Sequence, residues 1–309
     1  MKKNKVLLVG ATGYQGRYFA QQLKMSHFDS ILLVRNIESS GFDPDVYELT
    51  EADLCCRESI HGLCTGVDYV ISTLGLTRQK EDILHMDVDF QANANLVDEA
   101  VTSGVKKFMY ISVLYGDELR HIKLCEAKEK LVDYLKNSGL DYCVVRPNGF
   151  FSDMKEFLKM ADRGRILLFG NGKQLLNPIH GDDLARICVR ALEWDSKELE
   201  IGGPDLLTQN DIARLALHAC KKSGKIIYLP DWIRKLALSF VAKFSKSTKF
   251  GAAEFFFATT AMDMIAPKFG REHLNDFFLS EASQLYAGNL AACKREPDII
   301  NSSFFTPFE

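Results

Sequence analysis

Three glycines at fixed spacing mark the most chemically informative segment of the chain. Gly10, Gly13 and Gly16 stand in GATGYQG, directly after the apolar run at 5–10 and before an amphipathic stretch at 14–24. Such glycines permit a tight turn, let backbone approach a diphosphate and let a helix pack closely on a strand. Because a helix N-terminus offers free N–H groups and a positive dipole end, the segment predicts a dinucleotide-binding loop made by Gly10, Thr12, Gly13, Tyr14, Gln15 and Gly16. A glycine-rich turn without a ligand is the alternative.

The residues after the next two apolar runs bear on which dinucleotide is bound. Arg35 ends the run at 30–35, where an acidic residue would bind the adenosine ribose of NAD. An arginine can instead pair with a 2′-phosphate through its fork of N–H donors, so the sequence favours NADP(H) over NAD(H), unless Arg35 is only a surface residue. Asp53 and Leu54 follow the third run, where the Asp53 carboxylate either meets the adenine amino group or caps the next helix.

These residues need a sheet to bring them together, and the patterning predicts one. Strand-length apolar runs alternate with amphipathic stretches up to about residue 147, which predicts the α/β class, as a Rossmann-type doubly wound parallel sheet. The stretch 87–103 should end at Ser103-Gly104 and place on the sheet Phe90, Leu96, Val97, Ala100 and Val101. The expected strands are 5–10, 30–35, 46–49, 68–73, 107–112 and 141–147, and the expected helices are 14–24, 87–103 and 124–138.

Composition and charge narrow the function classes. The 309 residues are 47% hydrophobic and 26% charged with a net charge of −3, the balance of an ordinary globular protein. Such a surface offers no field for a phosphate backbone, so nucleic acid is not expected as a partner. The cysteines form no metal-ligand pattern, so no metal is expected, and Cys143 in an apolar run indicates a reducing compartment. Without a signal h-region or a bilayer-length apolar run, we expect a cytoplasmic protein.

The sequence texture changes after Pro147. The residues up to about 180 mix Phe, Gly and Asn with short helical stretches, which is typical of loops and lids at the carboxyl edge of a sheet. We therefore predict a nucleotide-binding core at 1–147 and a smaller, mostly helical substrate-cap region at 148–309, with 178–202 returning to the core. A helix is expected at 182–193, and Thr208 should cap another that begins near Gln209.

The segment 231–244 predicts an amphipathic helix. Its apolar residues recur at helical spacing beside basic ones, namely Trp232, Ile233, Leu236, Phe240 and Phe244 with Arg234, Lys235, Lys243 and Lys246. We prefer a cap helix that covers a hydrophobic substrate pocket, and peripheral contact of this helix with a membrane is the minority alternative. The phenylalanines at 254–258 and 304–308 indicate a large apolar cavity or a homo-oligomer contact.

Together these motifs resemble the atypical or extended short-chain dehydrogenase/reductases, of the NmrA-like and divinyl-chlorophyllide-reductase-like kind. The resemblance covers most of the chain and rests on VLLVGATGYQG, LLVRN, ADL, VDYVISTLG, NLVDEAVTSGVKKFMYISV, AKEKLVDYLKNSGLDYCVVRPNGFF, NPIHGDDLA and IGGPDLLTQNDIA. It implies an NAD(P)-binding oxidoreductase in which Thr73 and Leu74, after the fourth strand, lie beside the cofactor. The C-terminal FGREHLNDFF is similar to the ending of the divinyl reductase branch.

The resemblance also implies catalytic positions. Members of the family pair Tyr and Lys four residues apart on one helix, so that the ammonium lowers the pKa of the phenol and holds the nicotinamide ribose. Here the lysine position is Lys128, but the tyrosine position is Leu124, which cannot deliver a proton. Ser112 matches the family's serine, and Tyr115 is the candidate substitute acid. A solvated lysine and a packed loop tyrosine are the alternatives.

Two further segments carry candidate residues. Pro147, Asn148 and Phe150 resemble the strand-six exit that shapes the nicotinamide pocket, and they fit a Pro-Asn-Gly turn equally well. Among the histidines, His180 is expected to position the loop before a helix that starts at Asp182 and Asp183.

Two functions follow from these expectations. The first is an NADP(H)-dependent reductase of a hydrophobic small molecule, with an activated carbon–carbon double bond as the target that the resemblance implies. The second is a noncatalytic NADP(H)-responsive regulator or assembly factor of NmrA-like type, which the loss of the tyrosine favours.

Overall fold

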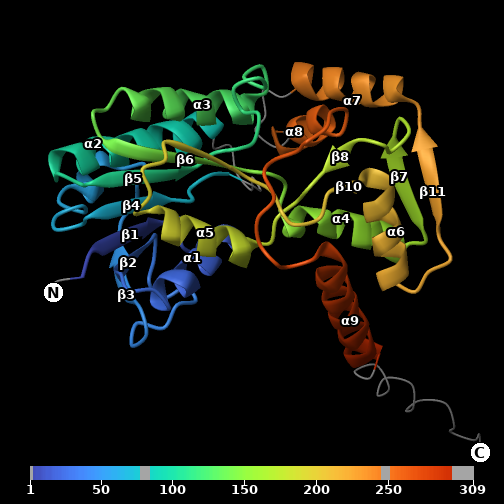
Figure 1. Cartoon of the computed structure of the whole chain (residues 1–309), viewed down its shortest axis with the longest axis horizontal. Helices are drawn as coiled ribbons and strands as arrows, with labels where there is room; N and C mark the ends of the chain where they lie inside the picture. The colour runs from blue at the N-terminus through green and yellow to red at the C-terminus, as the bar shows by residue number, and fades with distance from the viewer. Residues whose placement is uncertain (1–2, 77–83, 245–250, 294–309) are drawn as a thin grey trace, which may run out of the picture.

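The computed structural model describes residues 3–76, 84–244 and 251–293 (Figure 1). Its main element is a seven-stranded sheet with the order β3-β2-β1-β4-β5-β6-β9, in which every neighbouring pair is parallel. The predicted α/β class and doubly wound sheet are confirmed. The strands are β1 (Lys5–Val9), β2 (Asp29–Val34), β3 (Glu48–Glu51), β4 (Tyr69–Ser72), β5 (Lys107–Ile111), β6 (Asp141–Pro147) and β9 (Glu198–Ile201).

Strand β9 is the one strand of this sheet that the patterning does not predict. It lies at the sheet edge beside β6, and its sequence ELEI alternates charged and apolar residues. An edge strand with one covered face needs no continuous apolar run, so a search for such runs passes over it.

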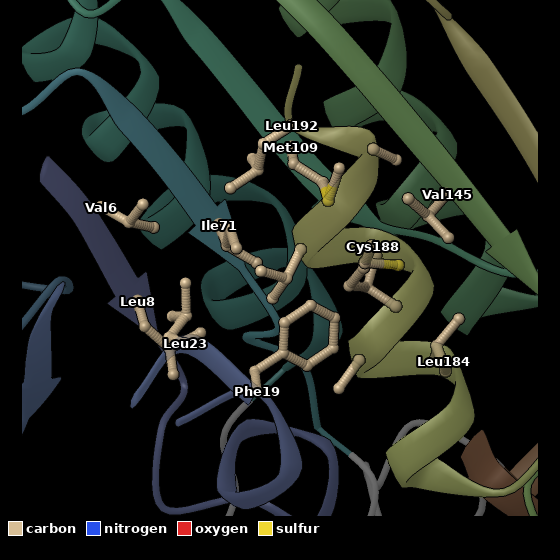
Figure 2. Close-up of a cluster of buried hydrophobic side chains, with 14 of the residues drawn as sticks. Val6, Leu8, Phe19, Leu23, Ile71, Met109, Val145, Leu184, Cys188 and Leu192 are labelled. Atoms are coloured by element: carbon tan, nitrogen blue, oxygen red, sulfur yellow. The ribbon is translucent and has the colours of Figure 1, made fainter. Parts of the chain in front are cut away.

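Helices cover both faces of the sheet. On one face lie α1 (Tyr14–Lys24) and α5 (Gly181–Ala191), and on the other lie α2 (Asn93–Thr102) and α3 (Lys123–Lys136). The side chains that fill the first layer include Phe19, Leu23, Ile71, Met109, Leu184 and Cys188 (Figure 2). Both layers are apolar and fully buried, which makes the sheet a rigid base for the loops at its carboxyl edge.

The predicted helix at 87–103 is divided into two parts. A π-helical stretch, η2 (Met86–Ala92), precedes α2, and the chain leaves α2 at Gly104 with a φ of +72°, as the C-cap signal predicts. Leu96, Val97 and Ala100 are buried as predicted, but Val101 is 45% exposed. At 3.6 residues per turn Val101 lies about 140° round the helix from Leu96, which is beyond the face that the sheet covers.

The cap region is built around a small parallel pair of strands, β7 (Arg165–Phe169) and β11 (Lys225–Leu229). Figure 1 shows this pair set apart from the main sheet. Its core joins side chains of three helices, among them Phe157, Leu158, Ile212, Ala216 and Phe278. The remaining elements are α4 (Phe151–Asp162), β8 (Leu175–Leu176), β10 (Leu207–Thr208), α6 (Gln209–Ala219), α7 (Asp231–Phe244), α8 (Gly251–Thr259), α9 (Leu274–Cys293) and the short η1 (Arg57–Ile60).

Two helix starts agree with the sequence prediction. Thr208 caps α6, since its side chain accepts a hydrogen bond from the Asp211 N–H. His180 caps α5, with Nδ1 accepting from the Asp182 N–H at 3.3 Å, so the helix begins one residue earlier than predicted, at Gly181.

Buried side chains around α5 fasten the C-terminal segment to the core. Asn177 donates to the Gly203 and Ala266 carbonyls, at 3.2 and 2.8 Å. Asp183 is fully buried and accepts hydrogen bonds from the backbone N–H groups of Arg271 and Glu272, at 2.9 and 2.8 Å. The motifs NPIHGDD and FGREH therefore meet in one junction.

Helix α7 is oriented the opposite way from the prediction. Trp232, Leu236 and Phe240 are 63, 62 and 60% exposed, whereas Arg234 is only 6% exposed. The Arg234 guanidinium bonds to Asp231 and to the Phe257 carbonyl at 2.8 Å, which holds the face with Arg234 and the half-buried Leu238 inward. The prediction that these apolar side chains cover a substrate pocket is therefore wrong. The side chain of Phe244, and Lys246 with the phenylalanines at 304–308, lie outside the described residues.

No helix in the described part of the chain combines the length and the apolar character that crossing a bilayer requires.

Candidate nucleotide-binding site

The glycine loop joins β1 to α1, and its geometry depends on two of its glycines. Gly10 has a φ of +80°, and a Cβ there would lie 2.7 Å from Thr73 Oγ1 and 2.9 Å from the Leu74 nitrogen. A Cβ at Gly16 would lie 2.1 Å from the Gly10 carbonyl oxygen. No side chain fits at either position, so the tight turn and the close approach of helix to strand need glycine.

The surroundings of Gly13 restrict a side chain less severely than those of Gly10 and Gly16. Its N–H donates to the Gly10 carbonyl at 3.0 Å, and a Cβ there would meet only that carbonyl oxygen, at 3.3 Å. Thr12 and Gly13 are exposed, and Gly13 is the N-cap of α1 without offering a side-chain cap. The first N–H groups of the helix are therefore open toward the side from which a diphosphate would approach.

Gln15 and Tyr14 flank this opening. The Gln15 side chain is 8% exposed, and neither its Oε1 nor its Nε2 forms a hydrogen bond with a described residue. A buried amide normally finds partners, so the orphaned Gln15 amide fits a ligand phosphate. The Tyr14 ring packs 5.3 Å from the Tyr18 ring and 6.2 Å from the Phe150 ring, and burial raises the pKa of its hydroxyl far above the usual value.

The adenosine end of the predicted site lies at the exits of β2 and β3. Arg35 follows β2 directly, is exposed, and forms no ion pair within the described ranges. The Asp53 carboxylate is exposed and accepts the Cys55 N–H at 3.0 Å. The alternative that Asp53 caps a helix is wrong, because η1 starts later, with Cys56 as its N-cap. Leu54 is buried under the sheet face.

The exit of β4 connects the glycine loop with the rest of the site. Thr73 Oγ1 donates to the Val9 and Gly10 carbonyls, at 2.9 and 3.2 Å, so this hydroxyl holds the loop. Leu74 is half-buried in the second apolar layer. In the sheet order, β1 lies between β2 and β4. The chain adds β2 and β3 on one side of β1 and then returns to add β4 on the other side. Ligands of doubly wound sheets bind at this kind of switch point.

Ser112 belongs to a buried ion network. Its hydroxyl donates to Glu129 Oε1 at 2.9 Å, and Glu129 is 1% exposed. Arg146 donates to both Glu129 oxygens, at 2.6 and 2.8 Å, and to Glu198 at 3.1 Å. Sequence reasoning did not identify Glu129 or Arg146, although an arginine inside the apolar run CVVRP is a signal for a buried partner.

The Lys128 ammonium lies next to the chain that follows β4, and oxygen atoms of three residues surround it. The distances from Nζ are 3.3 Å to Asp89 Oδ1, 3.3 Å to the Tyr110 hydroxyl and 3.4 Å to the Ile111 carbonyl. Burial lowers the pKa of Lys128, but Tyr110 and Asp89 outweigh it and raise the pKa above its usual value. Burial raises the pKa of Tyr110 to about 12. Lysine and tyrosine are therefore both protonated at neutral pH.

Asp89 and Tyr110 are the other site residues that sequence reasoning missed. Tyr110 is one more apolar-looking residue of a buried strand, and Asp89 lies in a helical stretch where acidic residues are usually solvated. Neither stands at a fixed spacing from Lys128.

Leu124 and Tyr115 occupy the surroundings where the family's tyrosine would act. Leu124 packs in an apolar cluster with Phe255, Ala258 and Met262 of the cap region. Tyr115 has a φ of +55°, and its hydroxyl donates to the Ile265 carbonyl at 2.9 Å. The Tyr115 proton is thus bound to backbone, and the role of this residue as an acid stays a prediction.

The strand-six exit joins the site to the cap. Asn148 is 3% exposed, and its amide donates to Asn177 Oδ1 and the Met264 carbonyl, at 2.7 and 2.6 Å, while its Oδ1 accepts the Gly149 N–H. Pro147 is buried at the end of β6. Of the three predicted residues, Phe150 is the one in contact with the glycine-loop helix, through Tyr14.

Comparison with known proteins agrees with this geometry. The family model described as NAD(P)H-binding matches residues 10–195. The Photosystem II assembly factor Ycf39 of Guillardia theta is 27% identical over 190 residues, which are 60% of this chain and 60% of the relative, so the match spans less than two thirds of that protein. The chloroplastic divinyl chlorophyllide a 8-vinyl-reductase of Arabidopsis thaliana is 25% identical over 332 residues, covering 93% of this chain and 79% of the relative.

A solved structure shares the fold over nearly the whole chain. The triphenylmethane reductase of a Citrobacter species has a TM-score of 0.72 at 16% identity, covering 91% of this chain and 99% of that one. The resemblance drawn from the motifs is confirmed: the chain belongs to the NAD(P)H-binding family, among the NmrA-like atypical short-chain dehydrogenase/reductases.

Proposed function

We propose that the protein is an NADP(H)-dependent reductase of a hydrophobic small molecule. The observation that carries the proposal is the glycine loop with the buried Gln15 amide, which has no partner in the described part of the chain. A bound diphosphate would accept from this amide and from the first N–H groups of α1.

Arg35 supports NADP(H) as the preferred nucleotide. Its guanidinium is exposed at the β2 exit, without a carboxylate partner among the described residues. A guanidinium pairs with a phosphate in a bidentate manner, whereas the unphosphorylated ribose of NAD(H) offers no such partner.

The chemistry that we propose is reduction of an activated carbon–carbon double bond, in which one carbon receives a hydride and the other a proton. A bound NADPH supplies the hydride. The apolar cluster around Leu124 favours a hydrophobic substrate, and the absence of a hydroxyl at this position favours solvent as the proton source. The divinyl reductase relative is named for a reaction of this type.

Nucleotide titration tests the proposal. NADPH should quench or shift protein fluorescence at lower concentration than NADH, and Arg35→Ala should remove the difference, because the guanidinium–phosphate pair is worth about 1.5–3 kcal/mol, or about 10- to 100-fold in affinity. Arg214→Ala is the control, since Arg214 is also exposed but pairs with Asp211 on α6, in the cap. Equal affinity of the wild-type protein for both nucleotides would contradict the role of Arg35.

A noncatalytic regulator or assembly factor is the second candidate. It is favoured because Leu124 has no acidic proton, the Ser112 hydroxyl is hydrogen-bonded to Glu129, and the Tyr115 hydroxyl is hydrogen-bonded to the Ile265 carbonyl. Single-turnover oxidation of bound NADPH by a panel of apolar enones and tetrapyrroles separates the two candidates. Tight binding without oxidation would favour the regulator, and its partner surface would then be sought at the exposed Trp232 and Leu236.

A further inference from the structure

Asp89 is a buried residue whose carboxylate has one oxygen held by hydrogen bonds and the other facing Lys128. It is 0% exposed on η2. Its Oδ2 accepts from His85 Nδ1 at 2.8 Å and from the Leu76 N–H at 3.3 Å. Its Oδ1 lies 3.3 Å from Lys128 Nζ and has no hydrogen bond that meets ordinary geometry within the described ranges. The carboxylate is thus oriented by one oxygen so that the other faces the ammonium.

The residues 73–75, which follow β4, lie between this ion pair and the glycine loop. Thr73 and Leu74 touch Gly10, as described above, and the next residue, Gly75, touches the pair. A Cβ at Gly75 would lie 2.7 Å from Asp89 Oδ1 and 3.1 Å from Lys128 Nζ. The exit of β4 therefore separates the ion pair from the nucleotide loop by only a few atoms of backbone.

Asp89 is also the anion that Lys128 depends on. The other titratable groups near the ammonium in the described part of the chain are Tyr110 on β5 and Cys125 and Glu129 on α3. Burial raises the pKa of the Cys125 thiol to about 12 and that of Tyr110 to about 12, so both are neutral. The Glu129 charge is paired with Arg146. Without Asp89, a nearly buried ammonium would have no compensating charge, and its pKa would fall.

We propose that Asp89 is a positioning residue for Lys128, which it keeps charged and aimed at the nucleotide that the glycine loop binds. The inference rests on the proposed function, since it assigns Lys128 a nucleotide as its ligand. With Leu124 in place of the family's tyrosine, the oxygen atoms in contact with the Lys128 ammonium come from η2 and β5 and not from its own helix.

The pH dependence of NADPH affinity tests this inference. Between pH 7 and pH 9 the wild-type affinity should be flat, because Lys128 stays an ammonium. In Asp89→Asn the affinity should fall by about tenfold over the same range, as the uncompensated lysine loses its proton. Lys128→Met should bind weakly at every pH, and Asp89→Asn/Lys128→Met should be flat and no weaker than Lys128→Met. Asp89→Glu, which keeps the charge, should restore a flat profile.

A matched control lies at the other end of β5. Asp141→Asn removes the carboxylate that faces Lys107, whose side chain is 8% exposed, so it perturbs a buried lysine remote from the loop. It should leave the NADPH profile flat. A flat profile at wild-type affinity for Asp89→Asn, or a pH-dependent profile that persists in the double variant, would overturn the proposal.

A nucleotide-free measurement separates this inference from the proposed function. In protein labelled with 13C at lysine Cε, the Lys128 signal, assigned with Lys128→Met, should titrate well below pH 10 in Asp89→Asn and not in the wild-type protein. An unchanged titration would overturn the role of Asp89 even if NADPH binds. A shifted titration in a protein that takes up no NADPH would instead overturn the proposed function and the assignment of a nucleotide to Lys128.

Discussion

Glu129 and Arg146 form a buried bidentate ion pair directly beside Ser112. Glu129→Ala would leave Arg146 with Glu198 as its remaining carboxylate partner, on the solvent side. Breaking a buried pair costs about 3–5 kcal/mol, and we expect a loss near the lower end, measured as the free energy of unfolding in urea. Glu156→Ala is the control, because the Glu156 pair with Lys159 is exposed and should contribute little. Equal losses in the two variants would show that the buried pair does not stabilise the fold.

Individual residues of the candidate site differ in how readily they can be predicted from the sequence. Gly10, Gly13, Gly16 and Arg35 stand at motif positions next to apolar runs, so spacing alone is enough to single them out. Asp89 and Tyr110 could not be found in this way, because they reach Lys128 from other elements and their types are ordinary for a helix and a strand. Contacts that form only when elements pack carry no signature in local spacing.

At the scale of the element, α7 allows a direct test of its inverted orientation. Arg234→Ala removes the charged hydrogen bonds to Asp231 and to the Phe257 carbonyl, so the free energy of unfolding should fall by about 1–3 kcal/mol. Asp231 keeps Lys235 as a partner, and the Phe257 carbonyl keeps the Thr260 hydroxyl. Leu236→Ser changes an exposed side chain and should stay within about 0.5 kcal/mol. The order of the two melting temperatures decides the matter: a Leu236 variant that melts first would mean that the apolar stripe is covered.

The same helix shows why element positions are easier to predict than the faces they bury. Apolar residues at helical spacing predicted α7 correctly as a helix, but they also predicted the buried side, and Arg234 reverses it by bonding into α8. Strand β9 and the π-helical geometry of η2 were not predicted, for a related reason. An edge strand and a widened turn both depart from the regular period that a sequence search uses.

At the scale of the whole molecule, His180 joins the nucleotide-binding core to the cap. Its ring lies 5.1 Å from Tyr18 of α1, 5.5 Å from Phe151 of α4 and 5.9 Å from Phe277 of α9, measured between ring centroids. Burial lowers the pKa of His180 below its usual value of 6.5. The unfolded chain therefore takes up a proton at this residue at a higher pH than the folded one does, so acidification favours unfolding.

The expected result is a steeper loss of stability on acidification in the wild-type protein than in His180→Asn. Asparagine keeps the helix-capping role but does not titrate. The free energy of unfolding, followed between pH 7.5 and pH 5, should fall more for the wild-type protein, with the difference developing as the pH drops through the unfolded-state pKa. Parallel curves would mean that the ring is not held in its neutral form by the junction.

The junction of Asn177, Asp183 and the segment near Gly270 also orders events during synthesis. The nitrogen of Gly202 donates to the Pro267 carbonyl, and the Phe269 nitrogen donates to the Gly202 carbonyl. Until residues 267–272 have been added, Asp183 has Arg186 as its charge partner but lacks the two backbone amides that complete its hydrogen bonding, and the exit of β9 lacks its neighbour. A nascent chain that already contains the glycine loop and all seven strands of the main sheet therefore still lacks the hydrogen bonds that fasten this end of the sheet.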